Sequence, residues 1–345
     1  MTSKDILAKL VSIDTIKDKG NSELFDFVEE YLKELGFHTE KKDKYLIMSY
    51  GDNPKLGFVG HADTVEYIDG WKTNPFELTE INGNLYGLGS VDMKGGIASF
   101  LKALSNTDLS KLKNGIKVYI TYNEEDGLQG IKDIVASNEC FPEYMIFGEP
   151  TDNIPMTACK GLFSVDLSTE GIKVHSSTPD KGRSAISFMM KLLTELEEYY
   201  NQNIKVEINN LYEVPYTTMN IGLFHGGSAT NSVAKECSSY VDFRVVDSKH
   251  IKMLKEKLAE LCERYYGKYS IHFDIEPFNN DVEFLSEKYS AGFMTEASFV
   301  RNRKRIILGC GPVTAHEIDE HVSVESLNKC IKQYEEIIKE VTMRE

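Results

Sequence analysis

The chain has 345 residues, of which 41% are hydrophobic and 27% are charged, and its formal net charge is −15. This length favours about two domains, and the composition is typical of a globular protein rather than a disordered one. An acidic chain is poorly suited to phosphate backbones, so nucleic-acid partners are disfavoured. No stretch approaches the roughly 20 apolar residues of a membrane span, and no export signal is recognisable. The cysteines are widely spaced and form no CxxC pair, so we expect free thiols and a cytoplasmic protein without membrane contact.

The first half of the sequence alternates helical and strand patterns. Helices are expected over 22–35, 93–104 and 128–136, and short apolar strands over 45–48, 56–59, 116–120 and 144–147. Continuous apolar strands separated by helices are typical of a mostly parallel sheet covered by helices on both faces.

The pattern changes near Gly161. Strands and helices follow in βαββαβ order: strand 163–168, helix 184–196, strands 217–222 and 236–245, helix 250–261 and strand 269–275. The strand 236–245 alternates apolar and polar residues, which predicts a sheet with one covered face. The earlier pattern returns with a strand over 305–308 and a helix capped by Ser323. We therefore predict an α/β fold in which a catalytic domain, 1–161 and 277–345, is interrupted by an inserted α+β domain, 162–276.

Potential metal ligands follow the predicted strands of the first half. They are His61 and Asp63 after strand 56–59, Glu124 and Glu125 after strand 116–120, Glu149 after strand 144–147, and Asp92 in a glycine-rich loop that opens a helix. Open α/β sheets place their sites outside the carboxyl ends of the strands, so these groups can converge. The glycine loop alone could indicate dinucleotide binding, but a carboxylate at Asp92 would repel a pyrophosphate. The combined pattern favours a metal site.

On these motifs the chain resembles the zinc-dependent aminoacylase/carboxypeptidase superfamily, and most closely its acetylornithine deacetylase branch. The segments that carry the resemblance are Gly60-His61-Ala62-Asp63, Gly87-Leu88-Gly89 with Asp92-Met93-Lys94-Gly95, Glu124-Glu125, Gly148-Glu149-Pro150-Thr151, His175-Ser176-Ser177, Gly226-Gly227 with Asn231, Thr295-Glu296-Ala297, and His316 with Asp319-Glu320. Two positions depart from the family pattern. Ser184 stands where Asn is usual, and His321 stands where Tyr is common.

The resemblance implies two zinc ions per subunit, with cobalt as an alternative metal and Asp92 as the bridging ligand. His61 and Glu149 would complete one site, and Glu125 and His316 the other; we prefer His316 over His321 because it precedes the family's acid pair at the right spacing. Imidazole and carboxylate ligands suit zinc. Asp63 would orient His61, Glu124 would act as general base, and the Asp92–Met93 peptide would be cis.

Further roles follow from the resemblance alone. His175 would donate to the oxyanion, reaching the partner's site in a homodimer that forms through the inserted domain. Substrate-binding positions are Lys160, Asn231, Arg244 and Thr295. From the residues alone, His175 could equally be a turn residue and Arg244 a solvated charge on a strand.

The resemblance implies an amidohydrolase that releases acetate from N2-acetylornithine and supplies ornithine for arginine biosynthesis. The alternatives are other hydrolases of small N-acyl amino acids: succinyl-diaminopimelate desuccinylase, acetyl-lysine deacetylase or a dipeptidase. These enzymes differ in the charge of the acyl pocket, which one sequence does not map. An inactive relative that acts as a binding module is disfavoured, because Asp92 and Glu124 are both present.

Overall fold

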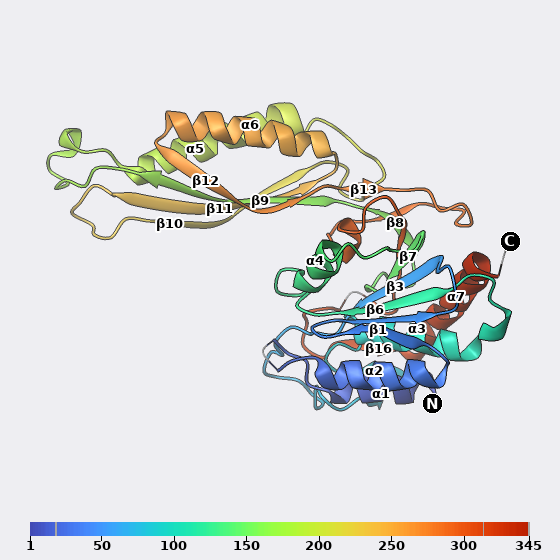
Figure 1. Ribbon diagram of the computed structural model, residues 1–345. Coiled ribbons are helices and arrows are strands. Elements are labelled where there is room, and N and C mark those ends of the chain that lie inside the picture. Colours follow the sequence, from blue (N-terminus) through green and yellow to red (C-terminus); the bar gives the residue numbers. More distant parts are fainter. Residues whose placement is uncertain (18, 313, 344–345) are drawn as a thin grey trace. The chain divides into compact units, whose positions relative to one another are not determined.

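The structure is a computed structural model that describes residues 1–17, 19–312 and 314–343 (Figure 1). It consists of two compact units. The first comprises Met1–Thr157, Asn280–Lys288 and Thr295–Glu345, and the second comprises Ala158–Asn279 and Tyr289–Met294. The predicted fold class is confirmed: a mixed α/β chain with a central, mostly parallel sheet and an α+β insertion.

The central sheet of the first unit has the strand order β1-β2-β6-β3-β7-β15-β8. These strands are β1 (His38–Lys42), β2 (Leu46–Tyr50), β3 (Leu56–His61), β6 (Ile116–Thr121), β7 (Tyr144–Phe147), β8 (Met156–Cys159) and β15 (Lys304–Ile307). The strands β6, β3, β7 and β15 run parallel, while the flanking pairs are antiparallel. A small separate sheet joins β4 (Thr79–Ile81), β5 (Asn84–Tyr86) and β16 (His321–Ser323).

The helices of the first unit cover both sides of this sheet, with α4 on the side opposite to α1 and α2 (Figure 1). They are α1 (Ser3–Ser12), α2 (Ser22–Glu34), α3 (Lys94–Asn106), α4 (Gln129–Ala136) and α7 (Val324–Thr342). As predicted, Ser323 caps α7, because its side chain accepts a hydrogen bond from the Ser326 N–H at 3.0 Å.

The core of the first unit brings α3 close to the strand ends. Phe58 of β3 stacks on Phe100 of α3, with ring centroids 4.1 Å apart. At Gly96 a Cβ atom would lie 2.1 Å from the Gly148 carbonyl oxygen, so only glycine permits this approach. The N-terminus of α3 therefore lies directly against the turn that follows β7.

The second unit contains an antiparallel sheet in the order β10-β11-β9-β12, with two helices packed on it. Its elements are β9 (Gly161–Glu170), α5 (Ala185–Tyr199), β10 (Thr218–Gly226), β11 (Glu236–Val245), α6 (Ser248–Arg264) and β12 (Gly267–Ile275), and two short strands, β13 (Phe278–Asn279) and β14 (Tyr289–Ala291), pair with β8. In β11 the residues Val241, Phe243 and Val245 are buried. Asp242 and Arg244, which alternate with them, are partly exposed, as the alternation predicted.

None of the six cysteines forms a disulfide bond, as the sequence predicts, and all except Cys140 are buried. Over the described residues, no helix combines the length and the apolar character needed to cross a membrane.

Candidate metal centre

His61 lies at the end of β3 and is almost completely buried, with 1% of its surface exposed. Its Nδ1 lies 2.9 Å from the backbone carbonyl oxygen of Asp63, and its Nε2 lies 3.0 Å from Oδ1 of Asp92. A carbonyl oxygen only accepts hydrogen bonds, so Nδ1 carries a proton and Nε2 faces the acidic groups. Burial is the largest single effect and lowers the pKa of His61. The hydrogen bond to Asp92 and the negative charges of Asp92, Glu149 and Glu124 together outweigh burial, so the pKa of His61 lies well above its usual value.

Asp92 faces two histidines. Its Oδ1 points to His61, and its Oδ2 lies 3.7 Å from Nε2 of His316. The predicted cis peptide bond between Asp92 and Met93 is present. A carboxylate with one oxygen toward each imidazole has the arrangement required of a ligand shared by two cations.

Glu125 and His316 form the second pair of predicted ligands. The imidazole Nε2 lies 3.1 Å from one carboxylate oxygen of Glu125 and 3.2 Å from the other. This hydrogen bond raises the pKa of His316 to about 9. The His316 side chain is 54% exposed, in contrast to His61, so this half of the centre faces solvent.

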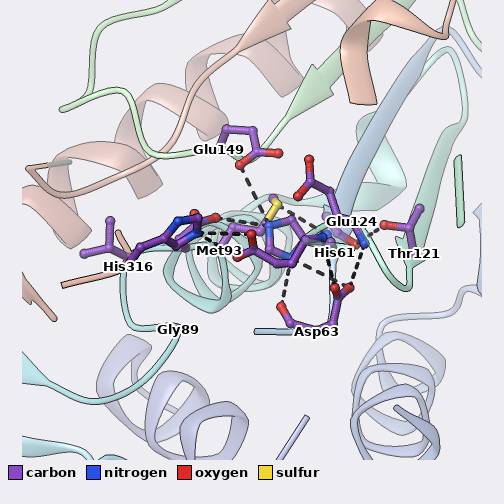
Figure 2. Close-up of polar contacts among 12 residues, drawn as sticks. His61, Asp63, Gly89, Met93, Thr121, Glu124, Glu149 and His316 are labelled. Carbon is purple, nitrogen blue, oxygen red and sulfur yellow. Dashed lines mark hydrogen bonds and ion pairs between the residues drawn. The ribbon is translucent and has the colours of Figure 1, made fainter. Parts of the chain in front are cut away.

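The five predicted ligands lie together at the carboxyl ends of the parallel strands. Ligand atoms of His61, Asp92 and Glu125 all lie within 4.8 Å of one another. Glu149 adds a carboxylate oxygen 3.9 Å from Nε2 of His61. Figure 2 shows this gathering of side chains around His61.

Two carboxyl groups of the cluster, those of the buried Glu149 and the half-buried Glu124, share His61 with Asp92 as a positively charged neighbour. Burial raises the pKa of Glu124 and of Glu149 well above the usual value, and neighbouring acids act in the same direction. A divalent cation would remove this conflict, since buried charges need paired or coordinating partners. The donor set of imidazole and carboxylate groups fits zinc.

Asp63 does not hold His61 in the expected way. Its carboxylate oxygen lies 4.0 Å from Nδ1 of His61, whereas its backbone carbonyl makes the hydrogen bond. The carboxylate instead accepts the backbone N–H groups of Glu124 and Glu125, each at 3.2 Å. Asp63 therefore connects the turn after β3 to the turn after β6.

His321 lies outside this cluster. It begins β16, its Nδ1 lies 2.9 Å from the Asp319 carbonyl oxygen, and its ring stacks on Tyr86 at 4.7 Å. Of the two candidate histidines, His316 is the one beside Glu125 and Asp92.

In the second unit, His175 and Asn231 come from neighbouring segments. The Ser176 N–H donates to the Asn231 carbonyl oxygen at 3.0 Å, and His175 forms a β-bridge with Ser232. The Ser177 N–H donates to Nδ1 of His175 at 3.2 Å. Because Nδ1 accepts this bond, the neutral ring carries its proton on Nε2, which can donate.

The remaining predicted positions have partners of their own. Lys160 is buried, and its ammonium donates to the Tyr216 carbonyl oxygen at 2.8 Å; burial and the Arg244 charge lower its pKa. Arg244 is half-exposed and pairs with Asp242 at 3.1 Å. Thr295 belongs to the first unit, whereas the other proposed substrate-binding residues belong to the second. Its buried hydroxyl caps a short helix by accepting the Ala297 N–H at 3.1 Å.

Glu296 is a buried acid near the centre that has no predicted role. One of its carboxylate oxygens has no hydrogen-bond partner among the described residues. Burial raises the pKa of Glu296 to about 7, while the charge of His61 acts in the opposite direction. The only sequence signal for this residue was its place in the Thr295-Glu296-Ala297 motif.

Comparisons with known proteins give consistent matches over most of the chain. Residues 157–270 match the peptidase dimerisation domain of the M20 peptidases. The chain is 32% identical to the acetylornithine deacetylase of Pasteurella multocida, over 92% of this chain and 90% of that protein. It is also 32% identical to the acetylornithine deacetylase of Photorhabdus laumondii, over 93% and 91%.

Solved structures share the fold. A tripeptidase from Staphylococcus aureus superposes with a TM-score of 0.81 at 23% identity, covering 99% of this chain and 98% of that one. A dinuclear metal-binding peptidase of the M20 family from Bacillus subtilis superposes with a TM-score of 0.73 at 11% identity, covering 98% and 97%.

Proposed function

The chain belongs to the M20 family of metal-dependent peptidases and deacetylases, which hydrolyse amide bonds, and we propose that it deacetylates N2-acetylornithine. The observation that carries the proposal is the convergence of His61, Asp92, Glu125, Glu149 and His316 on one point. The substrate is proposed from the acetylornithine deacetylases that match this chain over most of its length. The product ornithine would serve arginine biosynthesis.

We assign two zinc ions to the centre, with Asp92 between them. His61 and Glu149 would hold one ion, and Glu125 and His316 the other. The M20 peptidase from Bacillus subtilis, described as dinuclear, supports this number. When bound, the ions polarise the amide carbonyl and lower the pKa of the attacking water.

Glu124 is the proposed general base. Its backbone is held by Asp63 beside the proposed ligand Glu125, and its residue is half-buried next to the centre. A carboxylate in this position takes a proton from the attacking water and later delivers it to the leaving amine.

The second unit is proposed to supply the oxyanion donor and the homodimer contact. His175 presents an Nε2–H group because Nδ1 accepts the Ser177 N–H. The dimer is supported by the match of residues 157–270 to the peptidase dimerisation domain. Lys160, Asn231, Arg244 and Thr295 remain the proposed substrate-binding residues.

A second candidate is peptide hydrolysis, because the tripeptidase from Staphylococcus aureus shares the fold over nearly the whole chain. A turnover panel separates the candidates. It contains N2-acetylornithine, succinyl-diaminopimelate, acetyl-lysine, dipeptides and tripeptides, each assayed after removal of metal and addition of zinc or cobalt.

We expect the highest kcat/KM with acetylornithine, with stoichiometric release of acetate. A preference of tenfold or more for a peptide or a succinylated substrate would contradict the proposed substrate. A preparation of Glu124→Gln, purified in parallel, controls for contaminating deacetylases.

A further inference from the structure

The carboxylate of Glu320 is buried against the loop that carries Asp92. Only 2% of the residue is exposed. Its Oε2 accepts the Gly89 N–H at 2.8 Å, and its Oε1 accepts the N–H groups of Val91 at 2.8 Å and Asp92 at 3.0 Å. The Gly87 N–H donates to the backbone carbonyl oxygen of Glu320 at 3.1 Å. One residue thus satisfies four N–H groups between positions 87 and 92.

These contacts form a closed anion site inside the protein. Successive backbone N–H groups that point to one place make a nest for a negative charge, and a charged acceptor strengthens each hydrogen bond. Here the anion is a side chain of the same chain. The buried ammonium of Lys94, which donates to the Ile13 carbonyl oxygen at 2.9 Å, also interacts favourably with the charge of Glu320. Without the carboxylate, buried N–H groups would lose their partner.

The segment that contains Glu320 also carries His316, four positions earlier in the sequence. This segment is held on both sides. The Asp319 carboxylate accepts the Lys72 N–H at 2.8 Å and pairs with the Lys72 ammonium at 2.8 Å. On the other side, His321 pairs with Tyr86 in the small sheet. Glu320 therefore joins two fixed segments, one bearing His316 and the other bearing Asp92.

We propose that Glu320 is a positioning residue of the metal centre, which holds the backbone of Asp92 and ties it to the segment that carries His316. The inference rests on the proposed metal ligands. Asp92 turns one oxygen toward each histidine, so a shift of its backbone displaces a ligand of both proposed ions. Loss of the Glu320 carboxylate should therefore weaken both metal sites together.

Cobalt binding tests this proposal without relying on activity. Metal-free wild type, Glu320→Gln and Glu317→Gln are titrated with Co²⁺, with visible absorption and equilibrium dialysis as readouts. Glu317 is an exposed acid on the same segment, so its substitution makes the same change of charge without touching the loop. We expect Glu320→Gln to bind both ions about 10- to 100-fold more weakly, with an altered spectrum, and Glu317→Gln to match the wild type.

Equal affinity and an unchanged spectrum in Glu320→Gln would overturn the inference, whatever its thermal stability. A wild type that bound no cobalt would instead overturn the proposed centre, and this inference with it.

A second measurement does not require the variant to fold. In the metal-free wild type, the amides of Gly89, Val91 and Asp92 should exchange slowly with deuterium, because Glu320 rather than metal holds them. Exchange as fast as in exposed loops would overturn the proposal.

Discussion

The imidazole of His61 is oriented by the backbone of Asp63 and not by its carboxylate. The Nδ1–H group donates to the Asp63 carbonyl oxygen at 2.9 Å, which leaves Nε2 directed toward Asp92. The carboxylate of Asp63 holds the N–H groups of Glu124 and Glu125 instead. The main chain of Asp63 thus orients His61, while its side chain holds the turn that follows β6.

This division of roles predicts that Asp63→Asn weakens the binding of the two proposed metal ions unequally. The carbonyl that orients His61 remains, so the ion held by His61 and Glu149 should stay tightly bound. An amide cannot accept both N–H groups as a carboxylate does, so the turn that carries Glu125 should loosen. We expect the second ion to bind about 10- to 100-fold more weakly, measured by zinc titration with a chromophoric chelator. If both ions were bound more weakly by the same factor, the carbonyl and the carboxylate of Asp63 would not have separate roles.

Asp92→Ala should remove most of both metal ions, because the proposed bridge contributes to each. Metal content is measured by mass spectrometry after dialysis. Asp69→Ala, which changes an exposed acid, serves as the control. A dialysed Asp92→Ala protein that kept two tight zinc ions per chain would show that Asp92 is not the shared ligand.

Glu124→Gln should separate catalysis from metal binding. The substitution removes the proposed base and leaves the ligands in place, so turnover should fall by about 10²- to 10⁴-fold while metal content is unchanged. Both quantities are measured on the same preparation. Parallel loss of metal and activity would show that Glu124 is itself a ligand.

His175→Ala should lower turnover by about 10²- to 10³-fold without loss of metal, as expected for an oxyanion donor. Delivery to the partner's site can be tested with heterodimers of His175→Ala and Glu124→Ala chains. If His175 acts on the partner, one of the two sites keeps both groups, and up to half of the wild-type activity per dimer should return. Purified heterodimers as inactive as the parents would exclude action on the partner.

Glu29 on α2 predicts a pH-dependent stability. It accepts hydrogen bonds from the Lys33 ammonium at 2.8 Å, the Lys42 ammonium at 2.5 Å and the Thr39 hydroxyl at 2.6 Å. These contacts lower the pKa of Glu29 from 4.5 to about 2. Because the folded pKa is the lower one, the stabilisation is complete above pH 4.5 and is lost as the pH falls toward 2.

Glu29→Gln should therefore lower the free energy of unfolding by about 1 kcal/mol at pH 7, a value reduced for the partial exposure of both lysines. Urea unfolding at pH 7, 5 and 3.5 should show the difference from wild type shrinking at the lowest pH. The exposed neighbour Glu30→Gln is the control. A difference that stays constant down to pH 3.5 would mean that the charge of Glu29 is not the cause.

Elements with strong local signals were predictable from the sequence. The helix expected over 22–35 is confirmed as α2, which begins at Ser22 and ends at Glu34, shortly before Gly36 with its φ of +90°. The strands β7 and β11 are confirmed because their apolar runs and alternation are clear. Helix α1 was missed, although Thr2 and Asp5 form a capping box and its buried residues Ile6, Leu7, Leu10 and Val11 follow helical spacing. Strand β1 was missed because it is short and almost entirely exposed, and is defined only by pairing with β2.

The candidate site was likewise predictable in part. Its ligands could be expected to meet because strand ends of one parallel sheet share an edge. The hydrogen bonds that orient them could not be predicted, because they depend on how turns far apart in the sequence face one another. Asp63 and Glu125 are 62 positions apart, and Glu320 and Gly89 are 231 positions apart. No local pattern encodes such contacts.

The distance in sequence between Glu125 and His316, 191 positions, also has a consequence for biosynthesis. A ribosome makes His61, Glu125 and Glu149 and the strands that lead to them first, then the second unit, and only then His316. Until that late segment emerges, the early carboxylates lack both the imidazole that faces Asp92 and Glu125 and the carboxylate of Glu320 that holds the Asp92 loop. Domains generally fold as they are synthesised, but the half of this centre that contains His316 cannot be completed in that way. The ion proposed for Glu125 and His316 can therefore be bound by its full set of ligands only after nearly the whole chain has been made.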